Sequence, residues 1–586
     1  MSLSNVLPRR FPLGLRWVGQ LLWRLEHAFE RARASGKAED DTRLRIFFVM
    51  LVFGAGFCAI AAGATHAALF SDAVRSAGAG WAPPHARADL VDRNGRLLAA
   101  DLLHYGLYVD PAEIWDRAAT KKALAAALPE VSAERINRAL DDDRRTYLLG
   151  GLTPVERAAI HRLGLPGLTF EPEQRRVYPL NYTASHILGF ADTGGQGLAG
   201  AELALNDEVR GLAGTGRDVA LSIDLRVQGA LEDELREAAR AFTPRGAVGI
   251  VANVHTGEIL GLASYPDFDP NDPGAASADA RLNRAASTVF EMGSTFKAFT
   301  VAIGLDAGVA TMASTFDARE PYKLGYRTIH DYHAARKVLS LVEVFQHSSN
   351  IGTAKLAMGV GAQRLEQYFN ALGLTTKADV ELAESAAPLT PRIWNEDAVA
   401  STSFGHGMNV TPLALTQAML PLLNGGRRVP LTIRKLEPGA APEGERVLSE
   451  TTSAQMLQIM RANVTGGSGG KADAPGLSVG GKTGTGEKYD PEIRRYNTRR
   501  QVSSFAAVFP SDGPLENDRY FVLILLDEPK GTAETFGYST GGWVAAPAAG
   551  RVIGRIAPFL GVARHIGPLE NQPRLASVAD LDGGGR

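Results

Sequence analysis

A long uncharged run near the N-terminus constrains this chain more than any other feature. Residues 46–64 read IFFVMLVFGAGFCAIAAGA, which is long enough to cross a bilayer at a helical rise of about 1.5 Å per residue. The run begins late and exceeds the apolar core of a usual signal peptide, which favours an uncleaved anchor. Many arginines precede it, so the positive-inside rule places residues 1–45 in the cytoplasm. Everything after about Phe70 is therefore expected to fold on the other side of that membrane.

The exported part is long enough for more than one domain. The chain has 586 residues, of which 45% are apolar and 22% charged, a globular mixture. Its formal net charge of -2 gives no reason to propose nucleic acid as a partner. The single cysteine, Cys58, excludes an intrachain disulfide and any zinc-finger spacing. We expect an anchor over 46–66, a pedestal domain over 67–216, a second domain over 217–565 and a disordered tail over 566–586.

Residue periodicity predicts mixed secondary structure in both exported domains. Apolar and polar residues alternate on both sides of Asn94-Gly95, which predicts a hairpin, and residues 117–163 are expected to be helical. In the second domain, residues 246–265 form two apolar runs about a turn, the pattern of a buried hairpin. Helices dominate the middle, and strands return over 501–510 and 519–529. The expected fold class is α+β, with helices on a mostly antiparallel sheet.

A hydroxyl and an amine lie three residues apart in the apolar stretch FEMGSTFKAF. Ser294 and Lys297 are predicted to share one face of a buried helix, so that the amine reaches the hydroxyl. Burial disfavours the charged form of the lysine, and a neutral amine beside a serine is a base beside a nucleophile. A lysine extending from a core helix explains this pair alone equally well. Ser468 and Lys471 have the same spacing, but their glycine-rich stretch predicts a solvated loop.

Two further short motifs decide between these interpretations. Ser348 and Asn350 flank Ser349 in VFQHSSNIGTAKLA, and residues 482–485 read Lys-Thr-Gly-Thr after two glycines. Each motif alone predicts no more than a helix cap or a turn. In this order, the three motifs match a set shared by penicillin-binding proteins and class A β-lactamases: Ser-x-x-Lys, Ser-x-Asn and Lys-Thr-Gly.

Acyl transfer from a peptide needs the groups that these motifs supply. Ser294 is the expected nucleophile, and Lys297 is the expected base that takes its proton. Ser348, hydrogen-bonded between Lys297 and Lys482, is expected to return a proton to the departing amine. Asn350 is expected to hold Lys297 and the substrate amide in place.

The third motif is expected to bind the substrate. Lys482, Thr483 and Thr485 offer a positive charge and hydroxyls to a terminal carboxylate. Gly484, which lacks a side chain, is expected to let an extended substrate lie against the strand as an added strand. The backbone N–H groups of Ser294 and Thr485 are the expected oxyanion hole. This chemistry calls for no metal and no cofactor.

The chain as a whole resembles the class B penicillin-binding proteins, and closely their septal FtsI-like branch. Outside the three motifs, the resemblance rests on DRNGRLLA (92–99), RRVYPLNYTASHILGF (175–190), GLAGAELALNDEVRGLAGTG (197–216), NVHTGEILGLASYPDFDPN (253–271) and SFGHGMNVTPLALTQAML (403–420). It implies a transpeptidase domain of the penicillin-binding and serine β-lactamase-like fold, with an antiparallel sheet flanked by helices and a helical subdomain. An elongated α+β pedestal of the dimerisation type and a single transmembrane helix are expected before it.

The resemblance also implies a reaction and its partners. Ser294 would be acylated by a peptidoglycan stem pentapeptide ending in D-Ala-D-Ala, on lipid-linked or nascent strands, and would pass the acyl group to an amine of a neighbouring stem. β-lactams would acylate the same serine. Septal duty in cell division is implied, at the inner membrane with the catalytic domain in the periplasm. No segment resembles a glycosyltransferase, so a SEDS-type, FtsW-like glycosyltransferase and other divisome membrane proteins are the expected partners.

Some residues depart from the family's pattern, and some other functions share part of it. Ala88 stands where glycine is common, and Met292 where proline is common; neither change removes a catalytic group. An elongation-specific transpeptidase has the same motifs. A membrane-anchored β-lactamase needs a water-activating group that no motif supplies, and the intact catalytic set disfavours a β-lactam-sensing receptor or a silent scaffold. His347 and His406 are interpreted as structural, and the basic stretch Arg494–Gln501 as a solvated loop.

Overall fold

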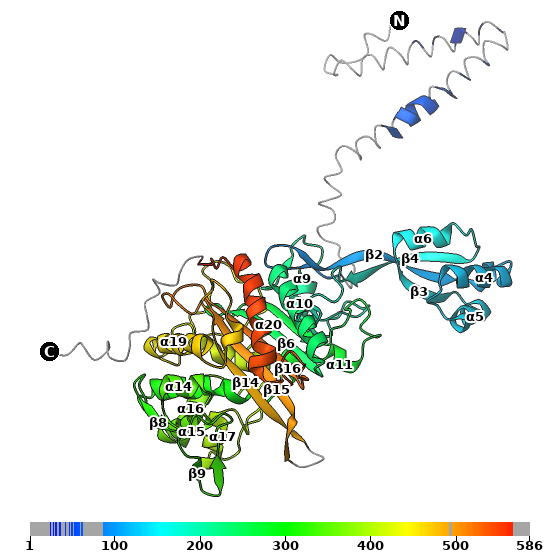
Figure 1. The fold of residues 1–586 in the computed structure, drawn as a ribbon. Helices are drawn as coiled ribbons and strands as arrows, with labels where there is room; N and C mark the ends of the chain where they lie inside the picture. The colour runs from blue at the N-terminus through cyan, green and yellow to red at the C-terminus, as the bar shows by residue number, and fades with distance from the viewer. Residues whose placement is uncertain are drawn as a thin grey trace, which may run out of the picture. The chain divides into compact units, whose positions relative to one another are not determined.

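The computed structural model describes residues 86–490 and 495–565, together with scattered residues between 24 and 61 (Figure 1). The chain divides into two units, residues 1–81 and residues 82–586. Secondary structure in the larger unit is mixed, and the α+β fold class is confirmed.

Part of the N-terminal and C-terminal predictions falls outside the described residues. In the predicted anchor over 46–66, the residues that are described are helical, and apolar side chains such as Phe53 and Phe57 are exposed. No helix among the described residues is long and apolar enough to span a membrane. Only isolated residues of the predicted cytoplasmic segment are described, and the predicted tail over 566–586 lies outside the described residues.

A five-stranded antiparallel sheet brings together strands from the start and the end of the second domain. Its order is β14-β15-β16-β6-β7, so that β16 pairs directly with β6. The predicted hairpin and the predicted late strands are confirmed. The solvated loop predicted for 494–501 is wrong from Arg495 onwards, because these residues pair with the end of β14 and begin β15. The strands are β6 (Gly246–Asn253), β7 (Ile259–Tyr265), β14 (Gly480–Asp490), β15 (Arg495–Phe509) and β16 (Tyr520–Asp527).

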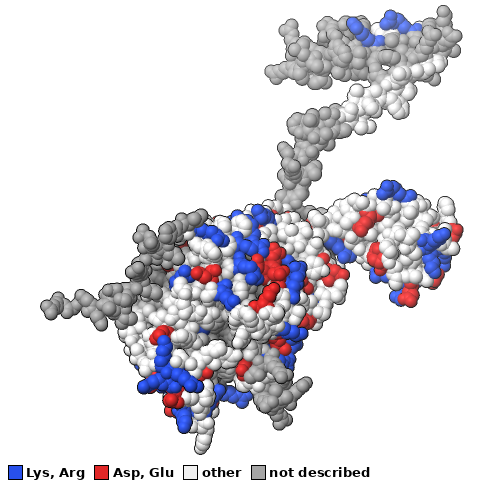
Figure 2. Space-filling view, viewed as in Figure 1, with Lys and Arg blue, Asp and Glu red and all other residues white. Residues whose placement is uncertain are grey.

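Helices cover both faces of this sheet. Side chains alternate along a strand, and on β16 Val522 and Ile524 join one hydrophobic cluster whereas Leu523 and Leu525 join the other. The first cluster contains α10 and α20, and charged side chains of both signs gather over these two helices in Figure 2. The second contains the helix that follows Ser294. The helices are α10 (Leu225–Phe242) and α20 (Gly541–Ile556) on one face, with α13 (Lys297–Asp306), α18 (Pro412–Met419) and α19 (Glu450–Gly466) on the other.

A subdomain of short helices and two-stranded sheets lies between β7 and β14 in the chain, and part of it has its own small core. β8 pairs with β11, β9 with β10, and β12 with β13. The strands are β8 (Thr315–Asp317), β9 (Tyr322–Leu324), β10 (Arg327–Ile329), β11 (Val338–Ser340), β12 (Arg427–Arg428) and β13 (Glu445–Arg446). The helices are α11 (Ala278–Arg281), α12 (Arg284–Ser287), η3 (Gly293–Phe296), α14 (Leu341–Gln346), α15 (Asn350–Val360), α16 (Ala362–Ala371), α17 (Glu396–Ser403) and η4 (Leu420–Leu422); η5 (Gly470–Ala472) and η6 (Ala557–Leu560) follow later in the chain.

A second five-stranded sheet takes β1 to β4 from the region predicted as the pedestal, and its fifth strand, β5, follows the predicted boundary at residue 216. The predicted hairpin is present as β1 and β2, with Leu90 opposite Ala99. The helical prediction for 117–163 is wrong over Thr146–Leu152, because these residues pair with β2 as β3 and bury Leu148 and Leu152. The strands are β1 (Leu90–Val91), β2 (Leu97–Val109), β3 (Thr146–Leu152), β4 (Leu168–Val177) and β5 (Val219–Ala220). The helices are η2 (Pro111–Glu113), α4 (Arg117–Ala127), α5 (Ala133–Asp141), α6 (Pro154–His161), α7 (Ser185–Leu188), α8 (Gly200–Ala204) and α9 (Asn206–Gly211).

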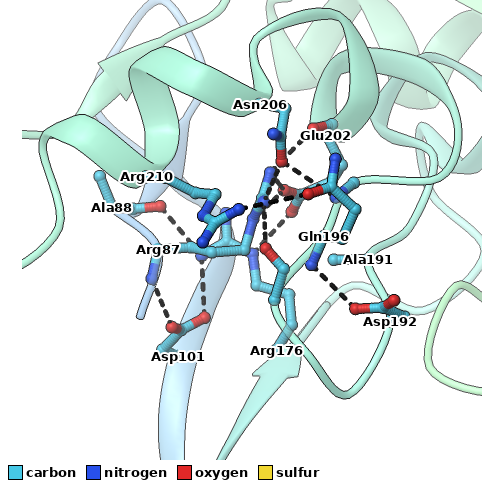
Figure 3. Close-up of polar contacts among 12 residues, drawn as sticks. Arg87, Ala88, Asp101, Arg176, Ala191, Asp192, Gln196, Glu202, Asn206 and Arg210 are labelled. Atoms are coloured by element: carbon cyan, nitrogen blue, oxygen red, sulfur yellow. Dashed lines mark hydrogen bonds and ion pairs between the residues drawn. The ribbon is translucent and has the colours of Figure 1, made fainter. Parts of the chain in front are cut away.

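A buried ionic network joins three segments of the pedestal that are far apart in sequence (Figure 3). Glu202 is completely buried and forms ion pairs with Arg87 at 2.6 Å and with Arg176 at 2.6 Å. Arg87 also donates to Asn206 Oδ1 at 2.7 Å, and Asp101 accepts hydrogen bonds from the backbone of Arg87 and the side chain of Arg176. Because each charge is paired, the network holds β2, β4 and the α8–α9 segment in one arrangement.

Candidate active site

Three elements bring the three predicted motifs together. Ser294 lies in η3, and Lys297 begins α13 directly after it. Ser348 and Asn350 flank Ser349, the N-cap residue of α15. The third motif lies on β14, whose strand partner among the described residues is β15 alone.

Lys297 is the centre of the site. Its side chain is completely buried, and its Nζ donates hydrogen bonds to Ser348 Oγ at 3.0 Å and to Asn350 Oδ1 at 2.7 Å. A third hydrogen bond reaches the backbone oxygen of Ser348. Burial lowers the pKa of Lys297 to about 7, although the negative charge of Asp331 opposes this shift. A substantial fraction of the amine is therefore neutral near pH 7, where it can act as a base.

Ser348 connects this lysine to the third motif. Its hydroxyl receives hydrogen bonds from Lys297 Nζ and from Lys482 Nζ, each at 3.0 Å, as the sequence predicted. Lys482 is also completely buried, and its pKa is lowered by burial and by the positive charge of Lys297. Ser348 has a φ of 54°, an uncommon conformation for a residue with a side chain, which costs about 1–3 kcal/mol. The fold thus maintains a strained residue between two buried amines.

The structure differs from the sequence prediction in the environment of Ser294. Its hydroxyl is half-buried and forms no hydrogen bond with any other described residue. The hydrogen bonds of Lys297 Nζ go instead to Ser348 and Asn350, and these three bonds use the three donors of an ammonium group. Once Lys297 is deprotonated, its lone pair needs a donor, which the adjacent Ser294 can supply.

Packing within the folded chain gives Gly484 a second reason to be glycine, besides the substrate approach predicted from the sequence. A Cβ at this position would lie 2.3 Å from Ser504 Oγ and 2.6 Å from the backbone oxygen of Met292. The missing side chain therefore lets the turn that carries Ser294 pack onto β14, and the approach of an extended substrate to this glycine stays a prediction. Gly293 makes the matching contact, since its Cβ would lie 2.3 Å from the backbone oxygen of Thr485. The N–H groups predicted for the oxyanion hole thus belong to two segments in direct contact.

The hydroxyls of Thr483 and Ser468 continue the hydrogen-bonded set of the third motif beyond Lys482. Thr483 Oγ1 lies 2.8 Å from Ser468 Oγ, which is 3.2 Å from Asn463 Oδ1. Lys471 Nζ lies 3.9 Å from the ring centroid of Trp543. Ser468 is exposed in a turn, as a solvated loop predicts, and its hydroxyl also contacts Thr483 of the third motif. Spacing alone gave no signal for this contact.

Other residues near the motifs were missed or given a structural interpretation. Burial, with the nearby charge of Lys297, lowers the pKa of His406 to about 4, so this histidine is neutral near pH 7. Glu291 Oε1 accepts hydrogen bonds from Tyr496 Oη at 2.8 Å and from the backbone of Gly407 at 3.0 Å. Burial raises the pKa of Glu291.

Among the described residues, no group of three or more His, Cys, Asp or Glu is placed to hold a metal ion.

Comparison with known protein families agrees with this geometry. Residues 247–554 match the penicillin-binding protein transpeptidase domain, and residues 83–196 match the penicillin-binding protein dimerisation domain. The chain belongs to the penicillin-binding transpeptidases. The resemblance inferred from the motifs is therefore confirmed.

Individual relatives extend over nearly the whole chain. A protein named probable peptidoglycan D,D-transpeptidase FtsI from Caulobacter vibrioides is 68% identical, over 98% of this chain and 99% of that protein. Peptidoglycan D,D-transpeptidase FtsI from Escherichia coli is 30% identical, over 80% of this chain and 83% of its own. A crystal structure of a peptidoglycan synthetase from Bifidobacterium adolescentis shares the fold, with a TM-score of 0.63 at 21% identity, covering 83% of this chain and 97% of that one.

Proposed function

We propose that this penicillin-binding transpeptidase is a peptidoglycan D,D-transpeptidase that forms an acyl-enzyme on Ser294. The observation that carries the proposal is the hydrogen-bonded set Lys297–Ser348–Lys482, in which a buried lysine has a pKa of about 7. The names of the relatives from Caulobacter vibrioides and Escherichia coli support the same activity.

In the acylation step, neutral Lys297 takes the proton of the Ser294 hydroxyl as the oxygen attacks the carbonyl carbon between the two terminal D-Ala residues. The backbone N–H groups of Ser294 and Thr485 stabilise the oxyanion. The carbon–nitrogen bond breaks, and the proton passes from Lys297 through Ser348 to the departing amine of D-Ala. The buried lysines need not carry an additional charge, because the proton taken from the serine leaves with the product.

In the transfer step, an amine of a neighbouring stem attacks the ester carbon of the acyl-enzyme. Lys297 and Ser348 take the proton that the attacking amine loses and pass it to Ser294 Oγ as the carbon–oxygen bond breaks. Asn350 holds Lys297 in position in both steps. Lys482, Thr483 and Thr485 bind the terminal carboxylate of the donor before acylation, because this carboxylate leaves with D-Ala. β-lactams place a strained amide at the same carbonyl position and acylate Ser294, so the chain is a target of these antibiotics.

The same proposal assigns a place in the cell. Residues 46–66 anchor the protein in the inner membrane with residues 1–45 in the cytoplasm, residues 67–216 form the pedestal and residues 217–565 the periplasmic transpeptidase domain. Septal cell-wall synthesis during division is the supported role, since the FtsI proteins of Caulobacter vibrioides and Escherichia coli are similar over most of their length. A SEDS-type, FtsW-like glycosyltransferase supplies the glycan strands, together with other divisome membrane proteins.

A donor-and-acceptor assay tests the activity. The full chain in detergent is incubated with a stem peptide ending in D-Ala-D-Ala and with an amine acceptor, and D-Ala release and cross-linked product are measured by mass spectrometry. We expect both products in equal amounts from the wild type and neither from Ser294→Ala. D-Ala release with water as the sole acceptor would instead support a hydrolase.

A further inference from the structure

We propose that Asp331 is a positioning residue of this active site. Its carboxylate holds the Ser348–Asn350 segment in place through hydrogen bonds to Ser349 and Ile351. It also supplies the negative charge that acts on Lys297. The inference rests on the proposed function, because it assigns Asp331 a part in the same acyl transfer. No sequence motif pointed to this residue, which lies in the stretch IHDYH after β10.

The carboxylate of Asp331 faces the first turn of α15. Its Oδ2 accepts a hydrogen bond from Ser349 Oγ at 2.7 Å, and its Oδ1 accepts one from the backbone N–H of Ile351 at 2.9 Å. Ser349 Oγ in turn accepts a hydrogen bond from the backbone N–H of Gly352 at 3.0 Å. A negative charge also complements the positive end of a helix. Asp331 thereby fixes the residues on both sides of Asn350.

The residue before Asp331 sets the orientation of the Asn350 side chain. The backbone oxygen of His330 accepts a hydrogen bond from Asn350 Nδ2 at 3.0 Å, and Asn350 Oδ1 then accepts from Lys297 Nζ at 2.7 Å. An amide has a donor side and an acceptor side, so the first bond decides which side Lys297 meets. The short segment after β10 therefore determines the groups that contact Lys297.

The charge of Asp331 acts on Lys297 in the direction that makes it a better base. Lys297 in turn acts on two other titratable groups, Lys482 from β14 and His406 from the segment after α17, and burial lowers the pKa of each. Burial lowers the pKa of Lys297 to about 7, and Asp331 opposes that shift. Without this carboxylate, the pKa of Lys297 would fall further and the amine would take the serine proton less readily.

The test is the pH profile of the second-order rate constant for acylation by a fluorescent penicillin, measured on the full chain. Asp331→Asn keeps the size of the side chain and removes its charge. We expect the acid limb of the profile to move from about pH 7 to lower pH by roughly half a unit or more. We expect the plateau value of the rate constant to fall by roughly two- to threefold, because a weaker base takes the serine proton less readily. Asp331→Ser is a second uncharged variant, for use if thermal unfolding shows that the first does not fold.

Two control variants separate charge from shape. Asp331→Glu restores the charge, and we expect its acid limb to return toward the wild-type position. Asp317→Asn removes an exposed carboxylate from β8 in the same subdomain, and we expect an unchanged profile.

The outcomes are distinct. An unmoved acid limb in both uncharged variants would overturn the inference and leave the proposed function intact. A limb displaced equally in Asp331→Glu would also overturn it, because the charge would not be the cause. Failure of both uncharged variants to fold would place Asp331 in the support of the fold instead. A wild-type protein that is not acylated would overturn the proposed function, and the inference with it.

Discussion

Replacing Gly484 by alanine tests whether the nucleophile turn depends on close contact with β14. The added Cβ would lie 2.6 Å from the backbone oxygen of Met292, where ordinary contact requires about 3.4 Å or more. Ser504 Oγ, at 2.3 Å, can rotate away, but the Met292 backbone must shift. The required displacement approaches 1 Å, and Ser294 lies two residues further along the chain. A misplacement of about 1 Å costs roughly 100-fold in rate.

The assay is the rate of acylation by a fluorescent penicillin, with thermal unfolding measured in parallel. We expect Gly484→Ala to fold and to be acylated about 100-fold more slowly than the wild type. Gly229→Ala is the matched control, because a Cβ there meets no atom within 4 Å in the middle of α10. It should keep the wild-type rate and gain up to about 1 kcal/mol of stability. A wild-type rate in Gly484→Ala would refute the packing explanation.

Three other predictions follow from the same contacts. Ser348→Ala removes the acceptor shared by two buried lysines and should slow acylation by roughly 10²–10⁴-fold, measured with the same penicillin, while binding before the chemical step changes little. The acylation rate of the wild type should rise with pH through about 7, because Lys297 acts in its neutral form and loses its proton there; a rate that is constant from pH 5.5 to 8.5 would contradict this base. Glu202→Gln leaves two buried arginines without their shared carboxylate and should reduce stability by about 3–5 kcal/mol in a denaturant titration, whereas Glu450→Gln, which breaks an exposed pair, should change it by less than about 1 kcal/mol.

The sequence was informative where residue type and local pattern determine the outcome. The strands of the central sheet are strongly apolar, so β6, β7 and β16 were predicted close to their observed positions. β15 was predicted only from residue 501 onwards, because its first residues are basic and polar. The hydrogen bonds of Ser348 to Lys297 and Lys482 followed from the chemistry that the three motifs share. β3 was missed because its pairing with β2 outweighs a weak local preference for helix.

The remaining features depend on contacts that no local pattern encodes. The packing of Gly484 depends on the backbone of Met292, which precedes η3 and is far from β14 in the sequence. Ser468 and Asp331 belong to stretches without regular periodicity. Their hydrogen bonds to Thr483 and Ser349 form only in the folded chain, so no local pattern predicts them. The direct contact of Lys297 with Ser294 was predicted from helical geometry alone, which did not include the competing acceptors of the second motif.

The central claim is that Ser294 forms a long-lived acyl-enzyme. Incubation of the purified full chain with a penicillin, followed by intact mass spectrometry over several hours, tests it most directly. The account predicts a single stable penicilloyl adduct on the wild type and none on Ser294→Ala. An adduct that persists in Ser294→Ala, or a wild-type adduct that is rapidly lost with release of hydrolysed drug, would contradict it.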